Sequence, residues 1–214
     1  MNKLGTFLIT GLLVVTLSTK VSAQNLSTDK KEWISTAASN SLEKAKGLFK
    51  FGRVISTKSE ETNIHAHYKA KPFQALKNYT YSGQFRIANA DGGIGVTFHS
   101  KYPSEDQYYR LRSFPGDPSF KIAPHPDGIQ NITEGDIDTE VAPSPGKWYN
   151  FKVMVRTTKK STRIRAKVWR INGKEPGWQI DCSDSSDIRI KTGKLGLWSL
   201  GSGKKEWRNL AIAR

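Results

Sequence analysis

The stretch 163–169 reads Arg-Ile-Arg-Ala-Lys-Val-Trp, and it decides the fold class. Apolar and polar residues alternate along it, so the cations and the tryptophan share one side: Arg163, Arg165, Lys167 and Trp169. A period of two is typical of a β-strand with one buried and one exposed face. We therefore expect a strand whose exposed face presents cationic side chains and an indole ring.

The same alternation recurs on both sides of this stretch. We expect strands at residues 64–68, 79–88, 94–98, 109–111, 149–155, 164–171, 194–200 and 207–213. Turn signals such as Asn89-Ala-Asp-Gly-Gly separate them, and no long segment has a helical period. Short strands at this spacing predict an all-β jelly-roll β-sandwich over residues 56–214, after a polar lead-in over residues 24–55. We expect the second, third and fourth strands to pair as consecutive hairpins.

The N-terminus predicts export. Met1-Asn2-Lys3 is basic, residues 4–19 carry no charge, and Val21-Ser22-Ala23 places small residues at a cleavage site. This pattern is that of a signal peptide, residues 1–23, cut after Ala23. The alternative is a membrane anchor, but the run is shorter than the roughly 20 apolar residues of a membrane span. We expect a secreted or periplasmic protein with no transmembrane anchor after cleavage.

The charge balance favours anionic partners. The chain has 34 Lys and Arg against 19 Asp and Glu, a formal net charge of +15. The signal peptide holds only two of those lysines and no acid, so the mature chain stays strongly basic. We expect an acidic polysaccharide as partner, and secretion argues against intracellular nucleic acid. Cys182 is the only cysteine, so no intramolecular disulfide forms. Separately, we expect the protein to be a monomer.

An ordered series of segments carries a family resemblance. They are Gly-Gly-Ile-Gly-Val-Thr-Phe at 92–98, Gly-Lys-Trp-Tyr-Asn-Phe-Lys-Val at 146–153, Ile-Arg-Ala-Lys-Val-Trp at 164–169, Glu-Pro-Gly-Trp-Gln-Ile at 175–180 and Thr-Gly-Lys-Leu-Gly-Leu-Trp at 192–198. The series resembles the concanavalin A-like lectin/glucanase superfamily, nearest to its laminin-G-like and 3-keto-disaccharide-hydrolase-like jelly rolls. The resemblance implies the jelly-roll fold. Such domains include lectins, carbohydrate-binding modules, hydrolases and lyases, so activity has to be argued from the site.

The glucanases of that superfamily carry paired carboxylates in a Glu-x-Asp-x-Glu or Glu-x-Asp-x-x-Glu strand motif, which this chain lacks. The acidic run Glu134–Glu140 does not match it and is expected to be a solvated loop or a weak cation site. The same holds for Asp181, Asp184 and Asp187. We expect no required cofactor; such oxygens could bind a structural Ca²⁺, but no metal site is assigned.

Counting alternate residues along each strand from the apolar ones places thirteen residues on exposed sides: the eleven candidate site residues named below, with Lys69 and Thr97. Each assignment would reverse at a bulge. Our leading hypothesis is that the protein binds an acidic polysaccharide on a basic, aromatic-bearing sheet face. Arginine and lysine would pair with carboxylates or sulfates, and an aromatic ring would stack on a sugar. The predicted ligand-binding residues are His65, His67, Gln84, Arg86, Arg112, Arg165, Lys167 and Trp169.

The competing hypothesis is a polysaccharide lyase acting on a uronic-acid polymer. β-Elimination needs a base, an acid and a group that neutralises the substrate carboxylate. His99, Tyr108 and Arg110 are the candidates for these roles, with His67 and Arg86 as alternatives for the base and the neutralising group. A third hypothesis, a hydrolase of modified disaccharides, rests on the resemblance alone. His65 and His67 also share a face and could ligate a metal, but no third ligand is near in sequence.

Overall fold

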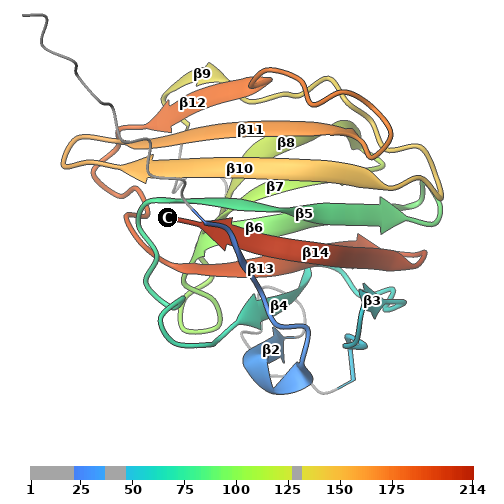
Figure 1. The fold of residues 1–214 in the computed structure, drawn as a ribbon. Coiled ribbons are helices and arrows are strands. Elements are labelled where there is room, and N and C mark those ends of the chain that lie inside the picture. Colours follow the sequence, from blue (N-terminus) through green and yellow to red (C-terminus); the bar gives the residue numbers. More distant parts are fainter. Residues whose placement is uncertain (1–21, 37–46, 127–131) are drawn as a thin grey trace, which may run out of the picture.

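The computed structural model describes residues 22–36, 47–126 and 132–214, and most of the predicted signal peptide lies outside them. The chain folds into two antiparallel sheets packed face to face, which confirms the predicted jelly-roll β-sandwich (Figure 1). Within the described ranges the helical structure is a single 3₁₀ turn, η1 (Lys30–Glu32), and no helix there is long and apolar enough to cross a membrane.

Sheet A faces the viewer in Figure 1, and sheet B lies behind it. Sheet A contains, in spatial order, β1 (Gln24–Asn25), β14 (Lys205–Ala213), β5 (Tyr79–Ile87), β10 (Tyr149–Thr157), β11 (Thr162–Arg170), β12 (Ile180–Asp184) and β9 (Glu134–Asp136), with β3 (Ile55–Thr57) also paired to β14. Sheet B contains β2 (Trp33–Thr36), β4 (Ile64–Tyr68), β13 (Lys194–Gly201), β6 (Gly92–Ser100), β7 (Tyr108–Phe114) and β8 (Asp117–His125).

The alternating stretch 163–169 is β11, as predicted. Its apolar residues Ile164, Ala166 and Val168 are fully buried between the sheets. The aromatic core joins the two layers: the ring of Phe85 on β5 stacks on Phe151 of the same sheet at 5.1 Å and on Phe120 of sheet B at 4.6 Å. The inward faces therefore bury the apolar residues and leave the intervening polar ones on the outer faces.

One predicted pairing is wrong. The second and third predicted strands, β5 and β6, do not form a hairpin, because the turn at residues 88–91 carries the chain from sheet A to sheet B. β5 pairs instead with β10 and β14, while β6 pairs with β7 as expected. The outward residues of β5 therefore lie on the opposite side of the molecule from those of β7.

The lead-in, residues 24–55, contributes to the sandwich. β1 pairs with β14 and β2 pairs with β4. Trp33 is buried against Tyr68 and Phe51, at ring-centroid distances of 5.0 and 6.0 Å.

Candidate functional site

The outer face of sheet A carries five of the predicted ligand-binding residues: Gln84, Arg86, Arg165, Lys167 and Trp169. They alternate with core residues on β5 and β11, so the predicted side of the strand is confirmed for all five. Lys167 is only 8 % exposed, because its ammonium group lies over the ring of Trp178 and beside Glu175.

Four outward side chains form a row across four neighbouring strands. The strand registers place Arg208 opposite Gln84, Gln84 opposite Asn150, and Asn150 opposite Trp169. Arg208 Nε donates to Gln84 Oε1 at 2.8 Å, and Gln84 Nε2 donates to Asn150 Oδ1 at 2.9 Å. These hydrogen bonds hold the guanidinium and the two amides in one orientation.

The ring of Trp148 extends this row. Two guanidinium groups lie close to it, that of Arg86 at 4.8 Å and that of Arg208 at 4.1 Å from the ring centroid. We name Arg208, Gln84, Asn150, Trp169 and Trp148 the platform. All five of its side chains are partly exposed.

Sequence reasoning missed three platform residues. Asn150 and Arg208 occupy outward positions next to the core residues Tyr149 and Trp207, so the same alternation could have identified them. Trp148 directly precedes β10, and no sequence signal indicates that two arginines lie close to its ring.

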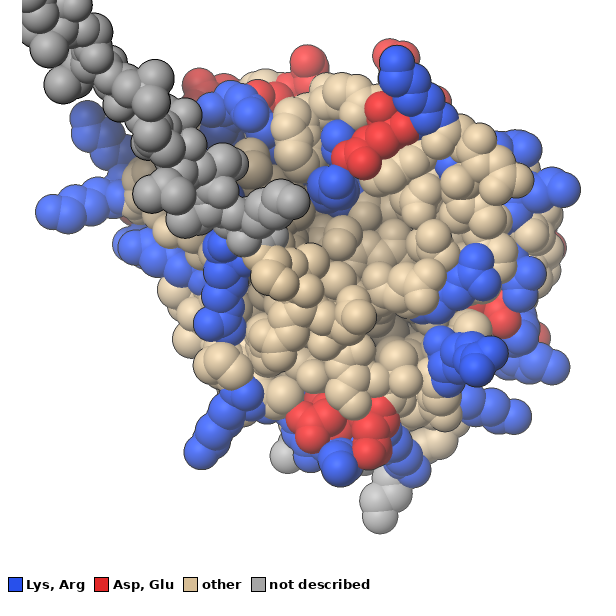
Figure 2. All heavy atoms as spheres, viewed as in Figure 1, with Lys and Arg blue, Asp and Glu red and all other residues tan. Residues whose placement is uncertain are grey.

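Acidic side chains form ion pairs with several cations on this face. Arg86 donates to Glu206 at 2.6 Å, Arg165 to Asp181 at 2.9 Å, and Lys167 lies 2.8 Å from Glu175. Hydrogen bonds from the neighbouring basic side chains hold the pKa values of Glu175 and Asp181 below their usual range. For Glu206, burial has the largest single effect and raises the pKa, but Lys204 and Arg86 together outweigh it, so this pKa is also lowered. In the same orientation as Figure 1, Figure 2 shows Lys and Arg around the margin, with acidic groups beside several of them.

The outer face of sheet B carries the other predicted residues, with one exception. His65 and His67 on β4 and Tyr108, Arg110 and Arg112 on β7 all point to this face, opposite the core residues with which they alternate. The structure thus divides the predicted ligand-binding residues between two opposite faces, and they do not form one site.

The expected exposure of His65 and His67 is wrong, because both are fully buried. Tyr102, from the loop after β6, covers them. Its ring stacks on His65 at 4.4 Å with an interplanar angle of 10°, and lies 5.3 Å from the ring of His67. Tyr108 is also fully buried, with its ring edge-on to His65 at 4.8 Å.

Burial keeps both histidines neutral. Desolvation holds the pKa of His65 well below its usual value, and the neighbouring His67 and Arg110 act in the same direction. Desolvation and the nearby Lys194 lower the pKa of His67 to about 3. Within the described residues, no group lies at hydrogen-bonding distance from any ring nitrogen of either histidine.

Arg110 stands at the margin of this cluster. Its guanidinium lies 5.2 Å from the ring of Trp198 and 5.8 Å from that of Tyr108. Asn63 accepts hydrogen bonds from Arg110, from the Tyr108 hydroxyl and from the Trp198 indole. Arg112 is paired with Asp117 at 2.7 Å.

His99 is the exception, and its predicted outward position is wrong. It has a positive φ of 46°, and its imidazole contacts the carbonyl oxygens of Ile190 at 3.1 Å and Lys77 at 3.3 Å. Its ring packs against the core residues Tyr79 and Tyr109. Desolvation lowers its pKa to about 4. His99 therefore does not join Tyr108 and Arg110 in one catalytic group.

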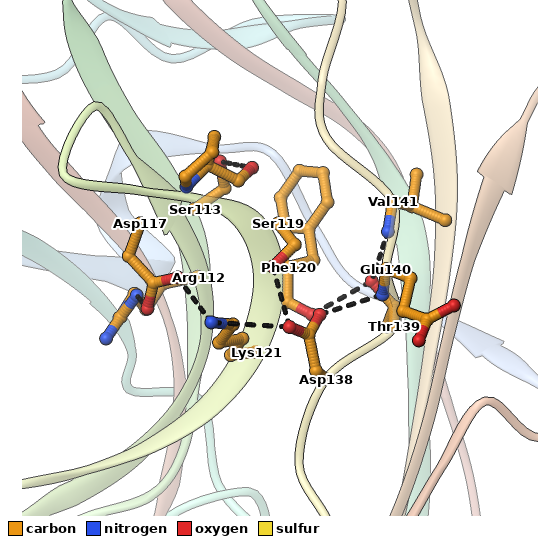
Figure 3. A network of polar contacts seen from close by, with 11 residues as sticks. Arg112, Ser113, Asp117, Ser119, Phe120, Lys121, Asp138, Thr139, Glu140 and Val141 are labelled. Carbon is orange, nitrogen blue, oxygen red and sulfur yellow. Dashed lines mark hydrogen bonds and ion pairs between the residues drawn. The ribbon is translucent and has the colours of Figure 1, made fainter.

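The acidic run 134–140 is tied to the sandwich by the pairing of β9 with β12 and by Asp138, so its first three residues are a strand and the expected loop is wrong there. Figure 3 shows Lys121 of β8 between Asp117, at 2.6 Å, and Asp138, at 3.3 Å. Asp138 also accepts a hydrogen bond from Ser119 at 2.9 Å. In the described part of the chain, no group of three or more His, Cys, Asp or Glu side chains is placed to hold a metal ion. A structural Ca²⁺ stays a prediction.

No protein-family profile matches the chain, and no characterised protein sequence matches it. Solved structures do match. They include carbohydrate binding module CBM66 from Bacillus subtilis (13 % identity, 75 % of this chain and 86 % of that chain, TM-score 0.54) and the Lotus tetragonolobus seed lectin (12 % identity, 90 % and 99 %, TM-score 0.52). A prokaryotic β-1,3-1,4-glucanase from a mouse hindgut metagenome also matches (8 % identity, 90 % and 98 %, TM-score 0.52). At these identities the likeness is one of fold.

Proposed function

We propose that this chain, which has the concanavalin A-like jelly-roll fold, is a secreted protein that binds an acidic polysaccharide on the platform of sheet A. The observation that carries the proposal is the row of Arg208, Gln84, Asn150 and Trp169 on four adjacent strands: hydrogen bonds link the first three side chains, and the strand register places Trp169 beside Asn150. Preorganised polar groups beside an aromatic ring suit a sugar, whose hydroxyls hydrogen-bond and whose ring faces are apolar.

Two further observations support a glycan ligand. Similar folds are found in a carbohydrate binding module and in seed lectins. The formal net charge of +15 favours an acidic polymer over a neutral one. The N-terminal pattern supports export to the periplasm or the medium. N-terminal sequencing of the protein from the periplasmic fraction and from the medium tests this, and the exported protein should begin at Gln24.

The test is affinity electrophoresis in gels containing alginate, pectate, hyaluronan or a neutral glucan. We expect an acidic polymer to retard the protein, with less retardation as salt rises because exposed charge pairs are screened. Trp169→Ala and Arg208→Gln should each weaken binding about tenfold, equivalent to 1.4 kcal/mol.

Arg112→Gln is the matched control, since it removes the same charge from the opposite face, where Arg112 is paired with Asp117. Binding that Arg112→Gln weakens and Arg208→Gln leaves intact would contradict the assignment to sheet A. Retention on no acidic polymer would contradict the proposal as a whole.

A second candidate is the uronate lyase, because His65, His67, Tyr108 and Arg110 share the outer face of sheet B. In β-elimination, a neutral histidine takes the proton from C5 of the sugar. The electron pair of the broken C5–H bond then forms the C4–C5 double bond, and the C4–O bond breaks. Tyr108 would give its proton to the leaving oxygen, and Arg110 would neutralise the carboxylate. Arg86 cannot take that role in this site, because it lies on sheet A.

This candidate requires the Tyr102 loop to move, since both histidines are buried beneath it. Incubation with uronic-acid polymers should then raise the ultraviolet absorbance of unsaturated products. Tyr108→Phe should abolish the rise, and His99→Gln should leave it unchanged. An unchanged rate in Tyr108→Phe would exclude the mechanism.

A further inference from the structure

A buried cluster of polar side chains lies on the outer face of sheet B, on the far side of the sandwich from the platform. Its floor is formed by His65 and His67 of β4 and by Thr97 of β6. Gly196 of β13 separates His67 from Thr97, and a side chain there would meet Thr97 Oγ1 at 2.4 Å and His67 Nδ1 at 3.0 Å. The absence of a side chain at Gly196 leaves room above the strand for both polar groups.

The floor is fully buried and chemically unsatisfied. Among the described residues, neither ring nitrogen of His65 or His67, nor the hydroxyl of Thr97, has a hydrogen-bond partner. Such buried orphan groups are rare in folded proteins, because each loses its hydrogen bonds to water without replacement. Each neutral imidazole offers one donor and one acceptor, a combination that sugar hydroxyls match because they both donate and accept.

Tyr102 occupies the position that such a ligand would take. Its ring lies parallel to both imidazoles and is itself fully buried. A phenol ring stacked on the histidines contributes dispersion, but it leaves their nitrogens without partners. A flat, six-membered ring bearing hydroxyls would keep the stacking geometry and add the hydrogen bonds.

Short polar contacts hold the Tyr102 loop in place. Tyr102 N donates to Ser100 Oγ at 3.2 Å, and Lys101 N donates to the Gln107 carbonyl at 2.9 Å. Lys194 Nζ donates to the carbonyl oxygen of Tyr102 at 2.7 Å. When the loop moves away, the Lys194 ammonium therefore loses an acceptor beside His67.

The charges around the floor favour an anionic ligand. Lys194 acts electrostatically on His67, and Arg110 acts on His65, so each histidine has a cation nearby. Asp106, on the same loop as Tyr102, is engaged by His125 at 3.1 Å. A carboxylate on the entering ring would meet Arg110 or the released Lys194.

We infer that His65, His67 and Thr97 form a binding site for a single uronic-acid ring, free or at a chain end, which Tyr102 occupies until the sugar displaces it. The site is independent of the platform, and its occupation does not require that elimination follows. Because the binding-competent form is populated only when the loop is open, the apparent affinity of the intact protein is reduced by that fraction.

The test titrates sodium D-glucuronate, with D-glucose as the neutral control, into protein with ¹⁵N-labelled histidines. Tyr102→Ala should bind glucuronate at least about tenfold more tightly than the unaltered protein, because the open fraction rises. Tyr102→Phe keeps the stacked ring, so its affinity for glucuronate should rise much less than that of Tyr102→Ala. Glucuronate should shift the side-chain ¹⁵N resonances of His65 and His67 and leave those of His99 unchanged.

The double variant Tyr102→Ala with His67→Gln should lose the gain. The inference is overturned if Tyr102→Ala folds but binds glucuronate no better than the unaltered protein. It is also overturned if His67→Gln and His65→Gln do not weaken the binding of glucuronate. If Tyr102→Ala does not fold, the histidine resonances of the unaltered protein decide, and no shift up to the solubility limit of the sugar overturns it. Trp169→Ala should leave every one of these results unchanged, which separates this site from the platform.

Discussion

The carboxylate of Glu175 lies 2.8 Å from the ammonium of Lys167, beside the ring of Trp169 on the outer face of sheet A. The same carboxylate lies 2.6 Å from Lys152. Glu175 thus pairs with both lysines that lie near Trp169, and each ammonium is about 6 Å from the centroid of the Trp169 ring. An anionic polymer has to compete with this carboxylate for them.

Glu175→Gln should therefore raise affinity for an acidic polysaccharide, about three- to tenfold at low ionic strength, because it frees two cations near a sugar-stacking ring. The gain should disappear at high salt. Affinity electrophoresis at two salt concentrations measures it. Glu105→Gln is the matched control, since it removes an exposed acid paired with Lys101 on the loop that covers sheet B. An equal gain in both variants would indicate a general charge effect.

Acid should destabilise the protein through its buried histidines. The pKa values of His67 and His99 are lowered to about 3 and about 4 from 6.5, and that of His65 is lowered too. The unfolded chain then binds more protons than the folded one below pH 6.5, so stability is complete above that pH and falls toward pH 4. The loss is about 1.4 kcal/mol per pH unit for each histidine. Urea denaturation at several pH values measures the free energy of unfolding. Its fall with decreasing pH should be less steep in His67→Gln than in the unaltered protein.

Gly196→Ala should destabilise the fold by about 1–3 kcal/mol, the usual cost of overpacking. The added methyl would lie 2.4 Å from Thr97 Oγ1 and 2.9 Å from the backbone oxygen of Ala66. Gly177→Ala is the control, because nothing lies within 4 Å of its added carbon, and its stability should be unchanged or slightly higher. The measurement is the midpoint temperature of thermal unfolding of each variant. Equal midpoints for Gly196→Ala and Gly177→Ala would contradict the close packing at Gly196.

Trp33→Ala should cost about 3–5 kcal/mol, as for other buried aromatic residues. The side chain is 5 % exposed, and its indole nitrogen donates to the Ser27 carbonyl at 2.9 Å. Chemical denaturation measures the loss. A change below about 0.5 kcal/mol, typical of exposed sites, would show that the lead-in does not support the sandwich.

Alternation was sufficient for the fold class. The period of two in β11 and β10 assigned each residue to the inner or outer face correctly, and the resemblance to the concanavalin A-like superfamily is confirmed at the level of fold. The hairpin predicted between β5 and β6 was wrong, because a turn that changes sheets has the same local composition as one that closes a hairpin.

Alternation could not show what covers an outer face. His65 and His67 lie on the predicted side, yet a tyrosine from a distant loop buries them, and a period of two contains no information about such a contact. His99 failed for a different reason. The positive φ at this residue breaks the alternation at the end of β6, and no turn residue in the sequence marks that position.

All five residues of β4 are buried, and the strand is paired on both edges, with β2 and with β13. Its amide hydrogens should thus be among the slowest in the molecule to exchange with solvent. The histidines of the closed site accordingly lie on a rigid strand, while the residues that cover them belong to a surface loop. Variation in residues 101–107 could alter which ring is admitted without disturbing the sandwich, so ligand preference and fold stability can change separately in this protein.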